Sequence, residues 1–283
     1  MRLRVPAGLA PLVATLLASV APLRAADCPP GHAEPLLLGG AGGVYFLADA
    51  GPLVVEVFKR DRNRRGSPAE LRAILFGPDR RVLAEARIPD DGLPRGKGMG
   101  PIQAATLSVT LPAKGVCGLI VTVSQDRYGE EALWGFRSSC PKQIIETARG
   151  HRDERHQEPI ILRNDEDAAN VCFLPRRGAI AIEVQHAGHG DPVRLLDSSG
   201  KTLETLPISG GKAAAQIAAD IPRDGGPWNL VIPKGESVVH IDGVTRWDKG
   251  DPFPDMACWS PRPDAWFPLL ENHRILTPYR RVL

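Results

Sequence analysis

The chain has 283 residues, of which 43% are hydrophobic and 24% are charged, and its formal net charge is +2. This composition excludes a largely disordered chain and leaves room for one large or two ordinary domains. The 29 glycines and 27 prolines favour many short strands joined by turns over long helices.

The start of the chain predicts a secretory signal peptide. Arg2 and Arg4 precede an apolar run over residues 5–21, and small residues follow at Ala25 and Ala26. The alternative is a retained membrane anchor, but the run is shorter than the ~20 apolar residues that a membrane helix needs. We therefore expect cleavage near Ala25 or Ala26, a secreted or periplasmic protein, and no transmembrane segment in the mature chain.

The charge of the mature chain differs from that of the whole sequence. Removing the signal removes three arginines and no acid, which leaves 32 basic and 33 acidic residues and a net charge of −1. The overall charge therefore gives no reason to expect a nucleic-acid partner.

An internal repeat is the most informative feature of the sequence. Residues 44–57 and 171–184 lie 127 positions apart and are identical at six of fourteen positions without a gap. The match continues downstream, where residues 75–83 align with 195–203. Two copies of one structural unit follow from this pattern.

Each copy has the periodicity of short strands. Residues 106–111 alternate polar and apolar, as a sheet with one buried face requires, and Asp197–Gly200 is a turn cluster between two strands. We therefore predict an all-β protein with two tandem antiparallel β-sandwich domains, of jelly-roll or immunoglobulin-like type, and a Pro-rich C-terminal tail. The expected boundaries are 1–26 for the signal, 27–140 for the first unit, 141–155 for a charged linker, 156–247 for the second unit and 248–283 for the tail.

The second unit resembles bacterial pre-peptidase C-terminal domains, β-sandwich modules that accompany secreted hydrolases. The resemblance rests on acids at 165–167, on Val171–Leu174, on Leu195–Asp197 with the turn at Gly200, and on the closing segment 224–232. It covers most of both units, and its motifs are mainly structural. It implies a non-catalytic role in binding, targeting or stabilisation, in some members with calcium.

Calcium is therefore considered at the acidic turn of the second unit. Asp165 and Asp167 supply the hard oxygen ligands that calcium prefers, although an acidic turn also serves simply to face solvent. The first unit carries Gly39–Gly43 in the equivalent place, so no such site is expected there. We expect no other cofactor.

Two additions to the repeat are candidate binding surfaces. Residues 59–65 hold five cations, and Arg62, Arg64 and Arg65 are suited to the carboxylate or sulfate groups of an acidic polysaccharide. The tail carries Trp259 and Trp266, whose flat faces suit sugar rings. The alternatives are a mobile solvated loop and a tail that packs its tryptophans onto the second unit. Trp134 and Trp228 are expected in the cores.

Five cysteines follow the signal, and export favours disulfides. We predict Cys117–Cys140, on the expectation that their strands form a hairpin, and Cys172–Cys258 as a second pair that ties the tail to the second unit. Cys28 then remains unpaired.

No nucleophile elbow, zinc-protease helix, P-loop or dinucleotide fingerprint occurs in the sequence, so no catalytic residue is assigned. The leading hypothesis is a secreted, non-catalytic binding or accessory protein that binds carbohydrate. One alternative is an envelope or assembly protein whose tail docks on another secreted or envelope protein. The other is a polysaccharide hydrolase or lyase, which would show a cleft with two convergent titratable groups between the units.

Overall fold

The computed structural model describes residues 36–40, 42–126, 129–146, 159–188, 190–223, 225–246, 258–270 and 273. The expected signal peptide, Cys28 and most of the expected charged linker lie outside these residues. The described chain is built from strands, with one short 3-10 helix, η2 (Pro263–Ala265). Within this part of the chain, no helix is both long enough and apolar enough to cross a membrane.

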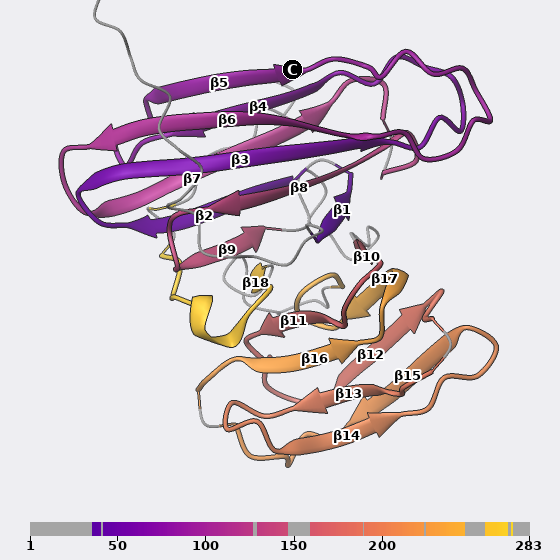
Figure 1. Cartoon of the computed structure of the whole chain (residues 1–283). Helices are drawn as coiled ribbons and strands as arrows, with labels where there is room; N and C mark the ends of the chain where they lie inside the picture. The colour runs from indigo at the N-terminus through magenta and orange to yellow at the C-terminus, as the bar shows by residue number, and fades with distance from the viewer. Residues whose placement is uncertain are drawn as a thin grey trace, which may run out of the picture.

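The described residues form nine strands in each unit (Figure 1). Those of the first unit are β1 (Leu37–Gly39), β2 (Gly42–Ala48), β3 (Gly51–Asp61), β4 (Leu71–Phe76), β5 (Val82–Ile88), β6 (Ile102–Leu111), β7 (Gly115–Val123), β8 (Ala132–Ser138) and β9 (Gln143–Glu146). Those of the second unit are β10 (Ile160–Asn164), β11 (Ala169–Phe173), β12 (Ile180–Gln185), β13 (Val193–Leu196), β14 (Thr202–Leu206), β15 (Lys212–Ile217), β16 (Trp228–Ile232), β17 (Gly235–Ile241) and β18 (Cys258–Ser260).

Both units have the same antiparallel topology. In the first, one sheet has the order β1-β8-β3-β6 and the other β9-β2-β7-β4-β5. In the second, the orders are β10-β17-β12-β15 and β18-β11-β16-β13-β14, which match strand for strand. Eight of the nine strands thus follow the jelly-roll arrangement of two four-stranded sheets, and the ninth extends one sheet. The predicted fold class is confirmed, and of the two arrangements expected the jelly roll is the one present.

The two sandwiches are joined edge to edge into one continuous pair of sheets, of eight and ten strands. In the smaller sheet β1 pairs with β10, and Leu38 lies opposite Leu162, its counterpart in the repeat. In the larger sheet β9 pairs with β18, and Ile145 lies opposite Trp259. In each sheet a strand of the first unit pairs antiparallel with its own counterpart in the second, β1 with β10 and β9 with β18. The two units are therefore related by an approximate twofold axis. The junction therefore has the symmetry of an isologous dimer interface within one chain.

The core follows from the period of two along each strand. The inward positions of β3 are Leu53, Val55 and Val57, and their counterparts on β12 are Ile180, Ile182 and Val184, all at most 1% exposed. Trp134 and Trp228 are buried in the core, as the sequence predicts.

Trp134 also explains one glycine of the Gly39–Gly43 run. A Cβ atom at Gly42 would lie 2.3 Å from the Cζ2 atom of Trp134, far inside contact distance. The indole fills that space and donates from Nε1 to the carbonyl oxygen of Gly40 at 2.7 Å. Gly42 is thus where a large core side chain meets the backbone.

Three strand boundaries differ from those expected. Gln143–Glu146, expected in the linker, is β9, and Cys258–Ser260, expected in the tail, is β18. The strand expected to end before the basic run continues to Asp61 as β3. β9 and β18 gain hydrogen bonds from strands distant in sequence, which no local pattern reveals, whereas the alternation of buried residues along β3 continues to Asp61.

Candidate functional site

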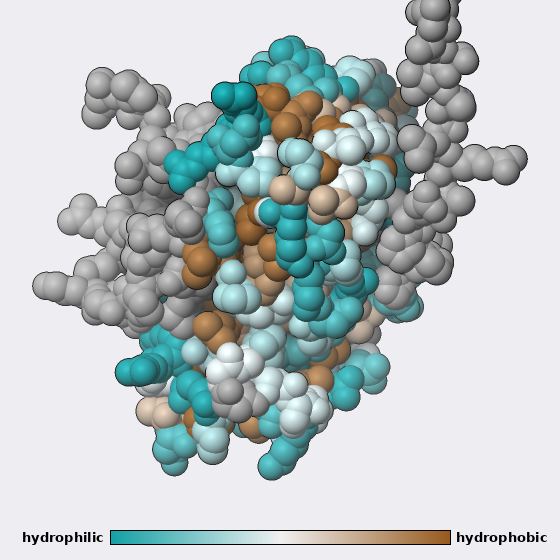
Figure 2. All heavy atoms as spheres, turned by 90° about the vertical axis from the view of Figure 1, so that its left-hand side faces the viewer, coloured by the Kyte–Doolittle hydropathy of each residue, from teal (hydrophilic) through white to brown (hydrophobic). Residues whose placement is uncertain are grey.

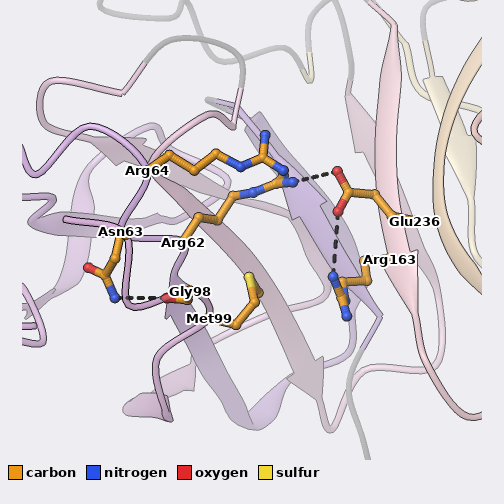
Figure 3. A pocket seen from close by; sticks show the side chains of 8 residues that line it. Arg62, Asn63, Arg64, Gly98, Met99, Arg163 and Glu236 are labelled. Carbon is orange, nitrogen blue, oxygen red and sulfur yellow. Dashed lines mark hydrogen bonds and ion pairs between the residues drawn. The ribbon is translucent and has the colours of Figure 1, made fainter.

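An open pocket of about 400 Å³ lies where the two units meet, on the side of the eight-stranded sheet. The first unit contributes the segment after β3 and the loop that precedes β6, and the second contributes β10 and β17 (Figure 3). The lining residues are Arg62, Asn63, Arg64, Gly96, Gly98, Met99, Arg163 and Glu236. The volume falls in the range of small-molecule binding sites.

Arg62 forms the buried floor of this pocket and is 4% exposed. It directly follows β3, and its Nη1 donates to the carbonyl oxygen of Gly129 at 3.1 Å. Its Nη2 forms an ion pair of 2.5 Å with Oε1 of Glu236, on β17 of the second unit. The pair joins the two units across their junction.

The wall from the second unit is a cross-strand pair. Arg163 on β10 lies opposite Glu236 on β17, and Arg163 Nη1 lies 3.5 Å from Oε2 of Glu236. Nε of Arg163 also donates to Asp165 at 2.9 Å. Glu236 therefore lies between Arg62 and Arg163, with one carboxylate oxygen toward each (Figure 3).

Arg64 is the exposed cation of the site. It extends in the same direction as Arg62 (Figure 3), and its guanidinium has no hydrogen bond or ion pair within the part of the chain that the structure describes. The lining holds three arginines and one glutamate, so its formal charge is +2. Asp165, which lies outside the lining, offsets part of that charge through Arg163.

Asn63 holds the loops of the first unit in place beneath Arg64. Its backbone is in the left-handed region, with φ of 53°, which asparagine tolerates better than most residues. Its Nδ2 donates to Oδ2 of Asp91 and to the carbonyl oxygen of Gly98, both at 3.1 Å. Its own carbonyl accepts from the amide of Gly96 at 2.7 Å. The segment after β3 and the loop before β6 are therefore held in position before any ligand binds.

The residues expected to bind ligand fall into separate places. Arg62 and Arg64 line the pocket, whereas Arg65 lies outside it and pairs with Glu130. Trp259 is 0% exposed on β18, so it offers no ring face to a sugar and its expected role as a platform is wrong. It is buried because β18 is a strand of the large sheet rather than a free tail.

Trp266 is half-buried and lies on a different sheet from the pocket. The tail from Phe267 to Leu269 packs with Tyr45 and Ile144 on the outer face of the ten-stranded sheet. Lys142 fixes it by donating to the carbonyl oxygen of Asp264 at 2.7 Å. The tail and the basic segment therefore do not share one surface. The alternative of a tail packed onto the second unit describes Trp259, whose strand pairs with β11, whereas Phe267 packs with Tyr45 and Ile144 of the first unit.

The face shown in Figure 2 bears on the assembly alternative. Hydrophobic residues there form separated groups among hydrophilic ones rather than one broad patch. The large hydrophobic residues that are exposed in the described chain are Val82, Leu83, Leu93, Ile102 and Leu270.

Asp165 and Asp167, the residues considered for calcium, are exposed. Asp165 accepts from Arg163, and the backbone amide of Asp167 donates to Oδ1 of Asn164 at 3.3 Å. Neither belongs to a group of three ligand-type side chains among the described residues, where the grouping found is Asp61, Asp90 and Asp91.

The four described cysteines are buried free thiols, so neither predicted disulfide is present. The expected hairpin was wrong, because β7 and β8 belong to opposite sheets of the jelly roll. Sγ of Cys140 instead donates to the carbonyl oxygen of Leu47 at 3.3 Å, and burial raises the pKa of Cys117 to about 11. Cys172 faces Oδ1 of Asn229 at 3.5 Å, and burial raises its pKa to about 12.

Sequence reasoning missed Arg163 and Glu236. They are 73 residues apart, and only the pairing of β10 with β17 brings them together. No local signal marks either residue, since each is a single charge at the edge of an apolar run.

The chain was compared with known families, curated proteins and solved structures. No family model matches it, and no curated protein matches it. Among solved structures it is similar to the N-terminal CBM22-1–CBM22-2 tandem domain of Paenibacillus barcinonensis Xyn10C, at 8% identity and a TM-score of 0.23. The match covers 68% of this chain and 78% of that one. At this TM-score nothing about function follows from the likeness.

Proposed function

We propose that this protein is a secreted, non-catalytic binding protein and that its junction pocket takes an anionic group of an acidic polysaccharide. The observation that carries the proposal is the exposed Arg64 guanidinium, which lacks a partner within the described chain and lines a pocket with Arg62 and Arg163. Arginine presents a planar fork of donors that matches a carboxylate or sulfate with two parallel hydrogen bonds.

The pocket is arranged before binding, which lowers the entropic cost of capture. Arg62 is fixed by Gly129 and Glu236, and the Arg64 segment rests on the hydrogen bonds of Asn63. Arg64 is the one lining arginine whose charge is left for a ligand, because Arg62 and Arg163 already engage Glu236. A single acidic group bound by Arg64, with weaker attraction from the other two, fits this arrangement.

The lining also favours binding over hydrolysis. Glycoside hydrolysis commonly uses two carboxyl groups on opposite sides of the scissile bond. Glu236 is the single carboxylate among the lining residues, and both of its oxygens face arginines. Arginine stays protonated near neutral pH, so it does not act there as a general base.

The test is isothermal titration calorimetry with oligogalacturonate, chondroitin sulfate oligosaccharides and neutral cello-oligosaccharides. We expect the acidic ligands to bind and the affinity to fall with added salt, since exposed charges are screened over roughly 8–10 Å at ~0.1–0.15 M. Arg64→Ala removes an exposed charge-assisted contact of roughly 1 kcal/mol, which corresponds to a loss of about fivefold in affinity.

Arg65→Ala is the matched control. It removes the same side chain one position away, where the guanidinium is exposed and paired with Glu130 outside the pocket. Equal binding of acidic and neutral oligosaccharides, equal losses in both variants, or cleavage of the ligand by purified protein would each refute the proposal.

A further inference from the structure

A second set of charged residues lies deeper in the first unit, between the sheets at the end that carries the long loops. The inward row of β3 continues from Val55 and Val57 to Lys59 and Asp61, because side chains alternate along a strand. Lys59 is 0% and Asp61 is 1% exposed, so two charges occupy positions that hydrophobic residues fill elsewhere on this strand.

Hydrogen bonds reach only one of the two carboxylate oxygens of Asp61 in this buried pair. Nζ of Lys59 donates to Oδ2 of Asp61 at 2.6 Å and to the carbonyl oxygen of Pro89 at 2.8 Å. The same Oδ2 accepts from the backbone amide of Asp91 at 2.9 Å. Oδ1 of Asp61 is buried and has no hydrogen-bond partner among the residues that the structure describes. A buried carboxylate oxygen without a partner is costly, which makes this oxygen a candidate ligand for a cation.

The carboxylates of Asp90 and Asp91 lie close to that of Asp61. One oxygen from each of Asp61, Asp90 and Asp91 lies within 4.8 Å of the others. Lys59 supplies one positive charge against the three negative ones, which leaves a formal charge of −2. Burial raises the pKa of Asp61, and the Asp91 carboxylate adds to that rise, while Lys59 opposes it.

We propose that Asp61, Asp90 and Asp91 bind a calcium ion, with Oδ1 of Asp61 as the buried ligand. Oxygen ligands bind calcium at about 2.3–2.6 Å, so two oxygens on opposite sides of the ion lie about 5 Å apart, in keeping with the spacing here. A site made of carboxylates, with neither imidazole nor thiolate, favours calcium or magnesium over zinc or copper. Ligands from the end of a strand and from a separate loop suit the flexible coordination of calcium better than the strict octahedron of magnesium.

The ion would fasten the end of β3 to the loop that follows β5. Asp61 ends β3, whereas Asp90 and Asp91 follow β5, and the amide of Ala69 donates to Oδ1 of Asp90 at 3.0 Å. Asn63 then connects this site to the pocket, since it bonds both Asp91 and Gly98. The calcium site does not depend on the proposed polysaccharide binding and is tested without any saccharide.

The experiment compares protein treated with EDTA and then dialysed with the same protein after addition of calcium chloride. Titration calorimetry should give one strong site, and the melting temperature should rise by about 5–10 °C at a free calcium concentration one hundred times the dissociation constant. Magnesium chloride at the same concentration should bind at least tenfold more weakly.

Variants locate the ion. Asp61→Asn leaves Lys59 without a carboxylate and so endangers the fold, and for this reason the main variant is Asp90→Asn with Asp91→Asn. We expect this double variant to lose calcium affinity by at least tenfold and to melt at the same temperature with and without calcium.

The matched control is Asp165→Asn with Asp167→Asn, which removes the same number of acids from an exposed turn of the second unit. Its calcium affinity should be unchanged. No calcium binding by the EDTA-treated protein would overturn the proposal. So would loss of binding in the Asp165 and Asp167 control with retention in the Asp90 and Asp91 variant.

Discussion

Arg62 of the first jelly roll donates to Glu236 of the second at 2.5 Å, and the arginine side chain is 3% exposed. The pair closes the floor of the pocket and at the same time links the two halves of the chain. Its removal should therefore affect both stability and ligand binding.

We predict that Glu236→Gln lowers the free energy of unfolding by about 2–3 kcal/mol. The substitution leaves the buried Arg62 guanidinium without a countercharge, and breaking a buried pair from one side is strongly destabilising. Urea denaturation measures the change. Glu85→Gln is the control, because its pair with Arg72 is exposed, at 32% and 46%, and an exposed pair contributes little to stability. A smaller loss at Glu236 than at Glu85 would contradict the role assigned to the junction pair.

The continuous sheets lead to a prediction about cooperativity. Because β1 pairs with β10 and β9 with β18, neither jelly roll can unfold without exposing strand edges of the other. Differential scanning calorimetry should show one transition for both units. Two well-separated transitions, each with about half of the total enthalpy, would show that the junction does not couple them.

Gly42→Ala should destabilise the protein strongly, because the new Cβ would lie 2.3 Å from Cζ2 of Trp134. We expect a loss of about 1–3 kcal/mol, typical of overpacking in a dense core. The same substitution should cost much less in a Trp134→Phe background, where the clashing part of the ring is absent. A cost that is equal in both backgrounds would mean that the indole does not set the requirement for glycine.

The buried thiols should be unreactive in the native protein. Burial raises the pKa of Cys117 to about 11 and that of Cys172 to about 12, so neither is a thiolate near neutral pH. In a Cys28→Ser variant we expect negligible reaction with Ellman's reagent at pH 8, and release of four thiols once urea unfolds the chain. Fast labelling of the folded variant would count against this prediction.

The same thiols set a direction for stability at high pH. An unfolded thiol with an ordinary pKa near 9 loses its proton before the folded one does, so the folded state binds more protons in that range. Stability is therefore expected to fall as the pH rises from about 9 toward 11. A Cys117→Ala variant should show a smaller fall across the same range, measured as the urea midpoint.

The sequence predicted those parts of the fold that follow from the periodicity within a strand or from the internal repeat. Apolar alternation and the 127-residue repeat gave both sandwiches, and Phe46 and Phe173 are indeed equivalent buried residues on β2 and β11. The joining of the sheets was missed, because β9 and β18 have only four and three residues and lie in charged or Pro-rich surroundings. Their pairing is a matter of long-range contact, not of periodicity.

The pocket at the junction was predicted only in part, because the sequence does not show which distant strands meet there. The charges of residues 59–65 indicated a solvated loop, although the period of two in β3 already placed Lys59 and Asp61 inward with Val57. Arg62 and Arg64 were identified by charge density alone. The partner of Arg62 across the junction, Glu236, follows from topology, since a run of cations does not reveal which carboxylate will bind it.

The proposed function requires that the junction pocket, and not the tail, receives an acidic saccharide. An amide and arginine side-chain NMR titration of isotopically labelled protein with oligogalacturonate tests this requirement. We expect chemical-shift changes concentrated at Arg62, Arg64, Gly96, Gly98 and Arg163, with the indole signals of Trp259 and Trp266 unmoved. Changes centred on Trp266 and the tail, with the pocket resonances unchanged, would contradict it.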